Sequence, residues 1–130
     1  MQIFTDGGAR GNPGPAAYGF VIKDEGKLLK EGFGKIGIAT NNVAEYTAVI
    51  EALKFLENNF KGQDLDFYID SQLVVSQLTG KFKVKNADIR ELVLKVKQLE
   101  GSFKGVTYTH IPREKNTQAD ALVNLALDNL

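Results

Sequence analysis

The spacing of apolar residues changes near residue 40 and divides the chain into two patterns. Before this point, three apolar segments at residues 2–6, 17–23 and 28–38 are separated by glycine-containing turns. This pattern predicts three consecutive antiparallel strands. After it, apolar residues recur every three or four positions between residues 43 and 60. That spacing predicts an amphipathic helix, with Asn42 as its N-cap.

The rest of the chain alternates strand and helix patterns. Strands four and five are predicted at residues 65–70 and 106–111, and helices at residues 71–78, 87–99 and 117–127. Because strand four follows a crossover helix, the right-handed crossover rule places it beside strand one and parallel to it. The predicted fold is of the α/β class, with a five-stranded mixed sheet of order 3-2-1-4-5 and helices on both faces.

Length and composition are those of one globular domain. A chain of 130 residues can bury a single core, so we expect one domain over residues 1–130. The chain has no cysteine, which excludes disulfides, thiolate metal sites and a cysteine nucleophile. No apolar run approaches the length of a membrane span, and the N-terminus lacks a signal-peptide pattern. We therefore expect a cytoplasmic monomer with no membrane partner.

Charge is balanced overall but unevenly distributed. Sixteen Lys and Arg residues match sixteen Asp and Glu residues, so the net charge gives no reason to invoke nucleic acid. Basic residues nevertheless gather between residues 81 and 97, at Lys81, Lys83, Lys85, Arg90, Lys95 and Lys97. This run is either a solvated face or a local basic patch.

A glycine-rich stretch, residues 5–15, follows the first strand and begins with one acid, Asp6. Glycine has no Cβ atom to keep another molecule away from the backbone. The stretch is therefore either a loop that a ligand can approach or a solvent-exposed turn. Its glycines are Gly7, Gly8, Gly11 and Gly14.

Four acids are predicted to meet at one edge of the sheet. Asp6 ends strand one and Asp70 ends strand four, so their carboxylates should lie side by side where two parallel strands end. Glu45 and Asp120 occupy the first turns of helices that can pack across the same edge. Each acid alone could instead be only a helix cap or stabilise a helix dipole.

Four carboxylates at one place need cations to neutralise their charge. Unpaired carboxylates raise one another's pKa unless positive charge neutralises them. A set of oxygen ligands without His or Cys suits Mg²⁺ or Mn²⁺ better than Zn²⁺. Two such ions would activate a water and stabilise the leaving oxygen of a phosphodiester, with no need for a protein nucleophile.

Four segments resemble the signature segments of type 1 ribonuclease H, in the family's order and over nearly the whole chain. They are residues 5–15, 40–46, 69–72 and 116–120. The resemblance implies a ribonuclease H-like fold and an endonuclease that cleaves the RNA strand of RNA–DNA hybrids with two Mg²⁺ or Mn²⁺ ions. It implies that the catalytic and metal-binding residues are Asp6, Glu45, Asp70 and Asp120.

The resemblance also implies residues that bind the substrate. Family members contact the RNA strand from the minor groove, where the 2′-hydroxyls are displayed. The implied contacts to RNA are Gly11, Asn12, Asn41, Asn42 and Gln72, and those to a phosphate of the DNA strand are Thr40 and Asn86. Asn41 and Asn42 could instead be helix-cap residues only.

The sequence departs from the family pattern in two places. Many relatives carry a basic, tryptophan-bearing handle where this chain has only residues 73–85, and the chain has no Trp. The short connector puts hybrid affinity in question, and its Phe82 could stack on the substrate or pack inwards. His110 has the spacing of a rate-assisting histidine in relatives, but its neighbours favour a structural position at the sheet edge. Arg113 could reach phosphate or simply be solvated.

Two other classes of function fit the same residues. A nuclease or phosphoesterase of this fold could prefer another substrate, such as duplex RNA, because groups that read 2′-hydroxyls can read one strand or both. A non-catalytic module could bind hybrids without turnover. The presence of all four acids argues against the second alternative.

Overall fold

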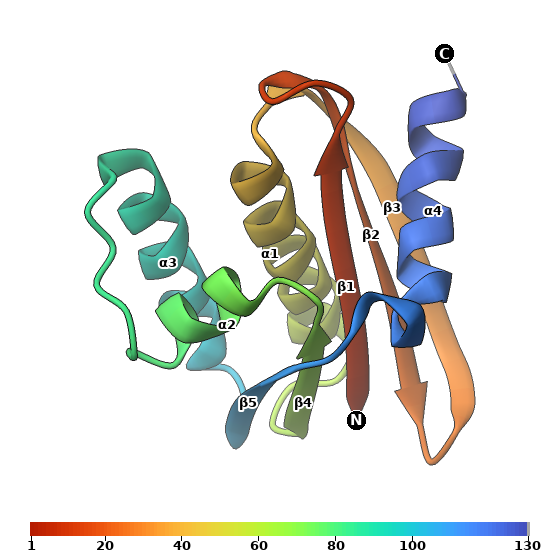
Figure 1. The fold of residues 1–130 in the computed structure, drawn as a ribbon. Coiled ribbons are helices and arrows are strands. Elements are labelled where there is room, and N and C mark those ends of the chain that lie inside the picture. Colours follow the sequence, from red (N-terminus) through yellow and green to blue (C-terminus); the bar gives the residue numbers. More distant parts are fainter. Residues whose placement is uncertain (130) are drawn as a thin grey trace.

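A five-stranded mixed sheet forms the centre of the molecule in the computed structural model, which describes residues 1–129 (Figure 1). Its strands lie in the order β3-β2-β1-β4-β5, with β1 antiparallel to β2 and parallel to β4. The predicted fold class and sheet order are thus confirmed. The strands are β1 (Gln2–Ala9), β2 (Gly14–Asp24), β3 (Lys27–Ala39), β4 (Asp64–Ile69) and β5 (Gly105–His110).

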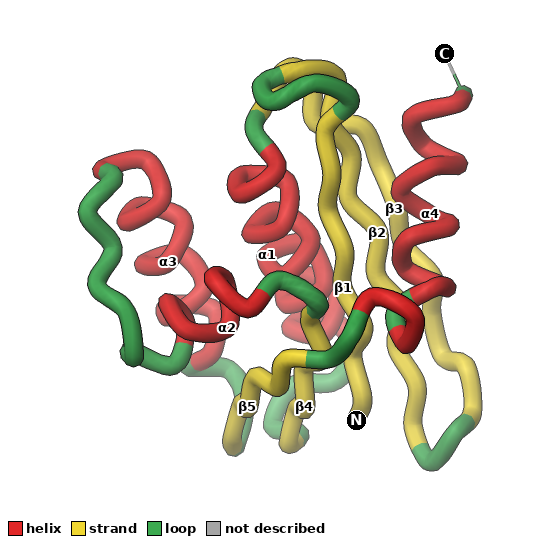
Figure 2. Tube along the Cα trace, viewed as in Figure 1, coloured by secondary structure: helices red, strands yellow, loops and turns green. Residues whose placement is uncertain are grey.

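Helices cover both faces of this sheet (Figures 1 and 2). On one side lie α1 (Asn41–Asn59), α2 (Gln72–Leu78) and α3 (Ala87–Glu100); on the other lies α4 (Thr117–Asp128), after the short 3₁₀ helix η1 (Arg113–Lys115). All four α-helices begin and end within two residues of their predicted bounds. Within residues 1–129, no helix is both long and apolar enough to cross a bilayer.

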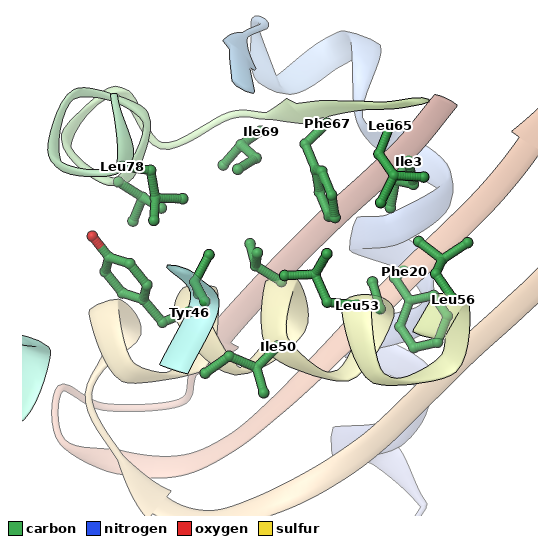
Figure 3. Packing of buried hydrophobic residues seen from close by; sticks show 14 of the residues in the cluster. Ile3, Phe20, Tyr46, Ile50, Leu53, Leu56, Leu65, Phe67, Ile69 and Leu78 are labelled. Carbon is green, nitrogen blue, oxygen red and sulfur yellow. The ribbon is translucent and has the colours of Figure 1, made fainter. Parts of the chain in front are cut away.

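The main core lies between α1 and the sheet (Figure 3). Tyr46, Leu53 and Leu56 on α1 pack with Ile3 on β1 and Phe67 on β4, and none of these five side chains is exposed. Truncating one such side chain to Ala costs about 2–5 kcal/mol. The packing therefore holds α1 firmly against β1 and β4, the two strands whose ends carry acids.

Strand β1 is longer than predicted. It pairs with β2 as far as Ala9 opposite Ala16, whereas its parallel pairing with β4 ends at Thr5 opposite Ile69. The prediction that Asp6 ends the first strand was therefore wrong, because only the β4 side of the pairing stops there. Gly7 and Gly8, predicted as turn residues, belong to β1.

Helix α1 begins earlier than predicted, at Asn41. Its N-cap is Thr40, whose hydroxyl oxygen accepts a hydrogen bond from the backbone N–H of Val43 at 3.2 Å. The assignment of Asn42 as N-cap was therefore wrong. As a result, Glu45 lies in the second turn of α1 and not in its first.

Candidate active site

Asp6 and Asp70 lie next to each other where the parallel pairing of β1 and β4 ends. The last paired residues are Thr5 and Ile69, so the next residue on each segment is an aspartate. Asp6 is only 8% exposed, and Asp70 is half-buried. The register of two neighbouring parallel strands thus brings two carboxylates together.

Glu45 reaches the same place from α1. One of its carboxylate oxygens, Oε1, accepts a hydrogen bond from the backbone N–H of Gly7. The helix can come this close only because residue 7 has no side chain: a Cβ there would lie 2.2 Å from the carbonyl carbon of Ala44. The expectation that this glycine leaves room for a ligand was wrong, since the chain's own backbone fills that space.

The space beside a second glycine of the same stretch is also occupied by the chain's own backbone. A Cβ on Gly14 would lie 2.1 Å from the carbonyl oxygen of Arg10. Gly14 therefore shapes the loop between β1 and β2 and offers no approach to a ligand. Gly11 has a positive φ of 94° and is exposed, a backbone conformation that favours glycine.

The carboxylates of Asp6, Glu45 and Asp70 form one close group, in which an oxygen from each lies within 4.8 Å of the others. They line a cavity of about 390 Å³. Asp120 lines the same cavity from the first turn of α4 but lies outside this close group. The four acids predicted at this edge therefore share one cavity, and three of them form the close group.

Helix α4 is positioned by another close backbone approach. A Cβ on Gly19 of β2 would lie 2.8 Å from the carbonyl oxygen of Ala119 and 2.9 Å from the Cβ of Leu122. The absence of a side chain at residue 19 lets the first turns of α4 lie directly on β2. This contact sets the position of Asp120 relative to the sheet.

Burial and crowding raise the pKa of two carboxyls in the group. Loss of hydration is the largest cause that raises the pKa of Asp6 to about 7, and the charge of Asp70 adds to it. Loss of hydration also raises the pKa of Glu45 well above its ordinary value, and the charge of Asp6 adds to that. The site favours protons, or another positive charge, at neutral pH.

No Lys or Arg within residues 1–129 forms an ion pair with these carboxylates. Their close oxygens and raised pKa values fit a divalent cation, which would supply the missing positive charge. Because the ligand atoms are all carboxylate oxygens, Mg²⁺ and Mn²⁺ suit the site better than softer metals.

Asn116 belongs to this site, although the sequence analysis gave it no role beyond its place at the start of the segment 116–120. Its side chain is 1% exposed, and its Nδ2 donates hydrogen bonds to the backbone carbonyl of Thr5 and to Oδ2 of Asp70. An asparagine directly before a predicted helix is typically an N-cap. The sequence alone therefore gives no reason to assign Asn116 a role other than helix capping.

A second cavity, of about 370 Å³, shares Asn41 and Asn42 with the acidic one. Most of the residues predicted to bind substrate gather there, whereas Gly11 and Gln72 line neither cavity. The predicted residues that line it are Asn12, Thr40, Asn41, Asn42 and Asn86.

Three of these asparagines use their side-chain oxygen to accept a hydrogen bond from a backbone N–H. Oδ1 of Asn12 accepts from the backbone N–H of Asn41, Oδ1 of Asn41 from that of Ala9, and Oδ1 of Asn86 from that of Ile89. Their amino groups make no hydrogen bond within residues 1–129. These amino groups are therefore hydrogen-bond donors that remain available to a ligand.

Three further side chains discussed from the sequence have clear positions. His110 is exposed at the end of β5 and lines neither of these cavities, whereas Arg113 in η1 lines the acidic cavity. Phe82 is 54% exposed, so the expectation that it could pack inwards was wrong.

Comparison with known proteins agrees with this architecture. The family described as Reverse transcriptase-like matches residues 4–126. Ribonuclease HI of Halobacterium salinarum is 44% identical over 130 residues, which cover 99% of this chain and 65% of that protein. Ribonuclease H of Dechloromonas aromatica is 33% identical over 147 residues, which cover 100% of this chain and 95% of that protein.

Solved structures show the same fold. The crystal structure of LC11-RNase H1 in complex with an RNA/DNA hybrid superposes with a TM-score of 0.94 at 45% identity, covering 98% of this chain and 96% of that one. The fold and its acidic edge define a ribonuclease H-like domain. The chain belongs to the ribonuclease H family.

Some relatives are considerably longer than this chain. It spans 65% of the Halobacterium protein and 35% of a bifunctional protein of Mycobacterium tuberculosis to which it is 42% identical. The shared part is therefore the ribonuclease H domain.

Proposed function

We propose that this chain is a metal-dependent endoribonuclease that hydrolyses the RNA strand of RNA–DNA hybrids. One observation carries the proposal: three carboxylates from three separate segments come within 4.8 Å of one another without an ion-pair partner in residues 1–129. Asp6, Glu45 and Asp70 would hold the divalent cations, Mg²⁺ or Mn²⁺, and Asp120 would complete the catalytic set.

The cations would supply the chemistry that the side chains lack, by lowering the pKa of water and stabilising the charge of the leaving oxygen. The chain's own residues hold the geometry. The Gly7 N–H fixes the carboxylate of Glu45, and the packing of α1 fixes its backbone. The guanidinium of Arg113, on the wall of the same cavity, binds a phosphate oxygen of the substrate strand.

The second cavity holds the substrate beside the acids. The amino groups of Asn12 and Asn41 donate to 2′-hydroxyls of the RNA strand, as does the side chain of Asn42. A deoxyribose cannot accept these bonds, which gives a preference for RNA at this place. Gly11 and Gln72 extend this contact along the strand.

A phosphate of the DNA strand binds between Thr40 and Asn86. The Thr40 oxygen already accepts the Val43 N–H, but its hydroxyl proton can still be donated. The amino group of Asn86 is likewise a donor, because only its oxygen is used to cap α3. Both side chains therefore combine a capping role with a role in binding.

A relative supports the same class of substrate. LC11-RNase H1 was solved with an RNA/DNA hybrid bound. The two chains are 45% identical, and the match covers 96% of the LC11 chain. The likeness covers 98% of this chain.

The experiment that tests the proposal compares three labelled duplexes under one metal condition: RNA–DNA hybrid, duplex RNA and duplex DNA. We expect Mn²⁺- or Mg²⁺-dependent cleavage of the RNA strand of the hybrid, with no cleavage of duplex DNA. Equal or faster cleavage of duplex RNA would show that the hybrid is not the preferred substrate. Tight hybrid binding without any cleavage would identify a binding module.

A further inference from the structure

Asn116 connects three of the four acid-bearing segments of the active site. Its Nδ2 donates to the carbonyl oxygen of Thr5, next to Asp6, at 2.8 Å and to Oδ2 of Asp70 at 3.0 Å. Its backbone carbonyl accepts the N–H of Asp120 at 3.1 Å. Figure 1 shows how this is possible: the segment between β5 and α4 passes across β4 and β1 before α4 begins.

The orientation of the Asn116 amide follows from its partners. Both groups in contact with Nδ2 are acceptors, a backbone carbonyl and a carboxylate, so the NH₂ end must face them. Both protons of this group are thereby used. The other end, Oδ1, is buried and has no hydrogen-bond partner within residues 1–129.

The position of Asn116 is costly for the helix that it precedes. Asn116 is the N-cap residue of α4 but makes no side-chain cap bond. A capping asparagine typically contributes about 0.5–2 kcal/mol relative to Ala. The side chain instead turns to the acids, which indicates that its amide serves the site and not the helix.

We propose that Asn116 is a positioning residue for the metal site, an inference that rests on the proposed function. Its NH₂ group binds one oxygen of Asp70 and turns the other towards Asp6 and Glu45. The same group ties Asp70 to the backbone of β1, so that the two aspartates move as one unit. Residues that orient metal ligands in this way typically change metal affinity 10- to 100-fold when they are replaced.

A neutral amide suits this task better than a basic side chain. Lys or Arg at residue 116 would also bind Asp70 but would add positive charge beside the cation site. The amide donates two hydrogen bonds without such competition. The result is a carboxylate oriented in advance with its charge left available to a cation.

The test measures Mn²⁺ affinity by calorimetry, together with kcat and KM on a labelled hybrid, for Asn116→Leu and Asn116→Ala. Leu has nearly the branched shape of Asn but no donor. Val96→Ala is the matched control, because Val96 is fully buried in α3 and does not line the acidic cavity. Its loss of stability shows what a general weakening of the fold does to the same measurements.

We expect the Mn²⁺ dissociation constant of both Asn116 variants to rise about 10- to 100-fold. Their kcat at limiting Mn²⁺ should fall by a similar factor, with partial recovery at high Mn²⁺, while KM for the hybrid stays within about twofold. Val96→Ala should keep both the metal affinity and kcat. If the Asn116 variants retain wild-type metal affinity and kcat, or merely match Val96→Ala, the positioning role is wrong.

A second measurement needs no variant at residue 116. In the ¹⁵N-labelled wild-type chain, titration with Mg²⁺ should shift the side-chain NH₂ signals of Asn116. Those of Asn59 and Asn129, which bind helix carbonyls on the surface, should stay in place. Unmoved Asn116 signals in a chain that binds Mg²⁺ and cleaves hybrid overturn this inference alone. A wild-type chain that binds neither metal overturns the proposed function and this inference with it.

Discussion

Gly7 of β1 lies directly against the backbone of Ala44 in α1, so that a Cβ on residue 7 would stand 2.2 Å from both the carbonyl carbon and the carbonyl oxygen of Ala44. This contact sets the distance between β1 and α1. Since Asp6 precedes Gly7 and Glu45 follows Ala44, the same contact also brings the two acids together. The separation of two ligands thus depends on a position that has no side chain.

We therefore expect Gly7→Ala to weaken both the fold and the site. A Cβ at that place must push α1 away from β1, an overpacking that typically costs about 1–3 kcal/mol. It also moves Glu45 from Asp6, so hybrid cleavage should fall at least about tenfold even at temperatures where the variant is folded. Urea unfolding and steady-state kinetics measure the two effects.

The neighbouring glycine provides the control for this experiment. A Cβ on Gly8 would lie 3.7 Å from Cγ1 of Val123, which is ordinary contact. Gly8→Ala should therefore be as stable as the wild type or slightly more stable. Because Gly8 itself lines the acidic cavity, this variant is the control for the stability measurement only. Equal losses of stability in the two variants would contradict the role given to Gly7.

The raised pKa of Asp6 predicts how pH changes the stability of the metal-free chain. This pKa is about 7 in the folded state against an ordinary value of 3.8, so between these pH values the folded state binds more protons than the unfolded state. The free energy of unfolding must then fall as pH rises. The contribution is fully present below about pH 4 and is lost as pH rises through about 7; the raised pKa of Glu45 acts in the same direction.

Asp6→Asn removes this titration. In EDTA, the variant should be more stable than the wild type near pH 8, by on the order of a few kcal/mol because each pKa unit corresponds to about 1.4 kcal/mol. Near pH 4, the two chains should be about equally stable. Urea unfolding at both pH values checks this, and a stability difference that does not depend on pH would disprove it.

Asp88 faces the place proposed for a DNA phosphate. It lines the second cavity with Thr40 and Asn86, and its negative charge would repel a phosphate there. Exposed charge pairs are worth about 0.2–1 kcal/mol, so Asp88→Asn should lower KM for the hybrid by a factor of about 1.4–5, with kcat unchanged. The effect should shrink at high salt.

Glu91→Gln is the control for Asp88, because Glu91 also lies on α3 but does not line the second cavity. It should leave KM unchanged. If Asp88→Asn raises KM, or if both variants change it equally, the phosphate does not bind at Thr40 and Asn86.

Much of this architecture could be predicted from the sequence, because it depends on periodicity and on the handedness of one crossover. The switch from strand to helix spacing near residue 40 fixed the element order, and the crossover placed β4 beside β1. Once those strands were parallel neighbours, Asp6 and Asp70 had to meet. The meeting of these two aspartates follows from topology alone, whereas the approach of Glu45 also depends on the contact between Gly7 and Ala44.

Other parts of the site depend on distances between elements, which residue spacing does not report. Thr40 and Asn42 are both good N-caps, and only the extended backbone at Thr40 decides between them. The close contact of Gly7 with α1 is visible only in the structure. Asn116 has the sequence position of a cap, and its turn towards Asp70 depends on where η1 ends.

The central claim is that a cation held by this acidic group drives cleavage of the RNA strand of a hybrid. The most direct test compares Asp6→Asn with Asp66→Asn on a labelled hybrid in Mn²⁺. Asp66 also lies in the β1–β4 pairing, opposite Gln2, but it does not line the acidic cavity. Its carboxylate accepts a hydrogen bond from the hydroxyl of Thr107. The account predicts that Asp6→Asn folds but loses cleavage at least about a thousandfold, on the order of 4 kcal/mol in the barrier, while Asp66→Asn cleaves like the wild type. An Asp6→Asn chain that cleaves the hybrid at the wild-type rate would contradict it.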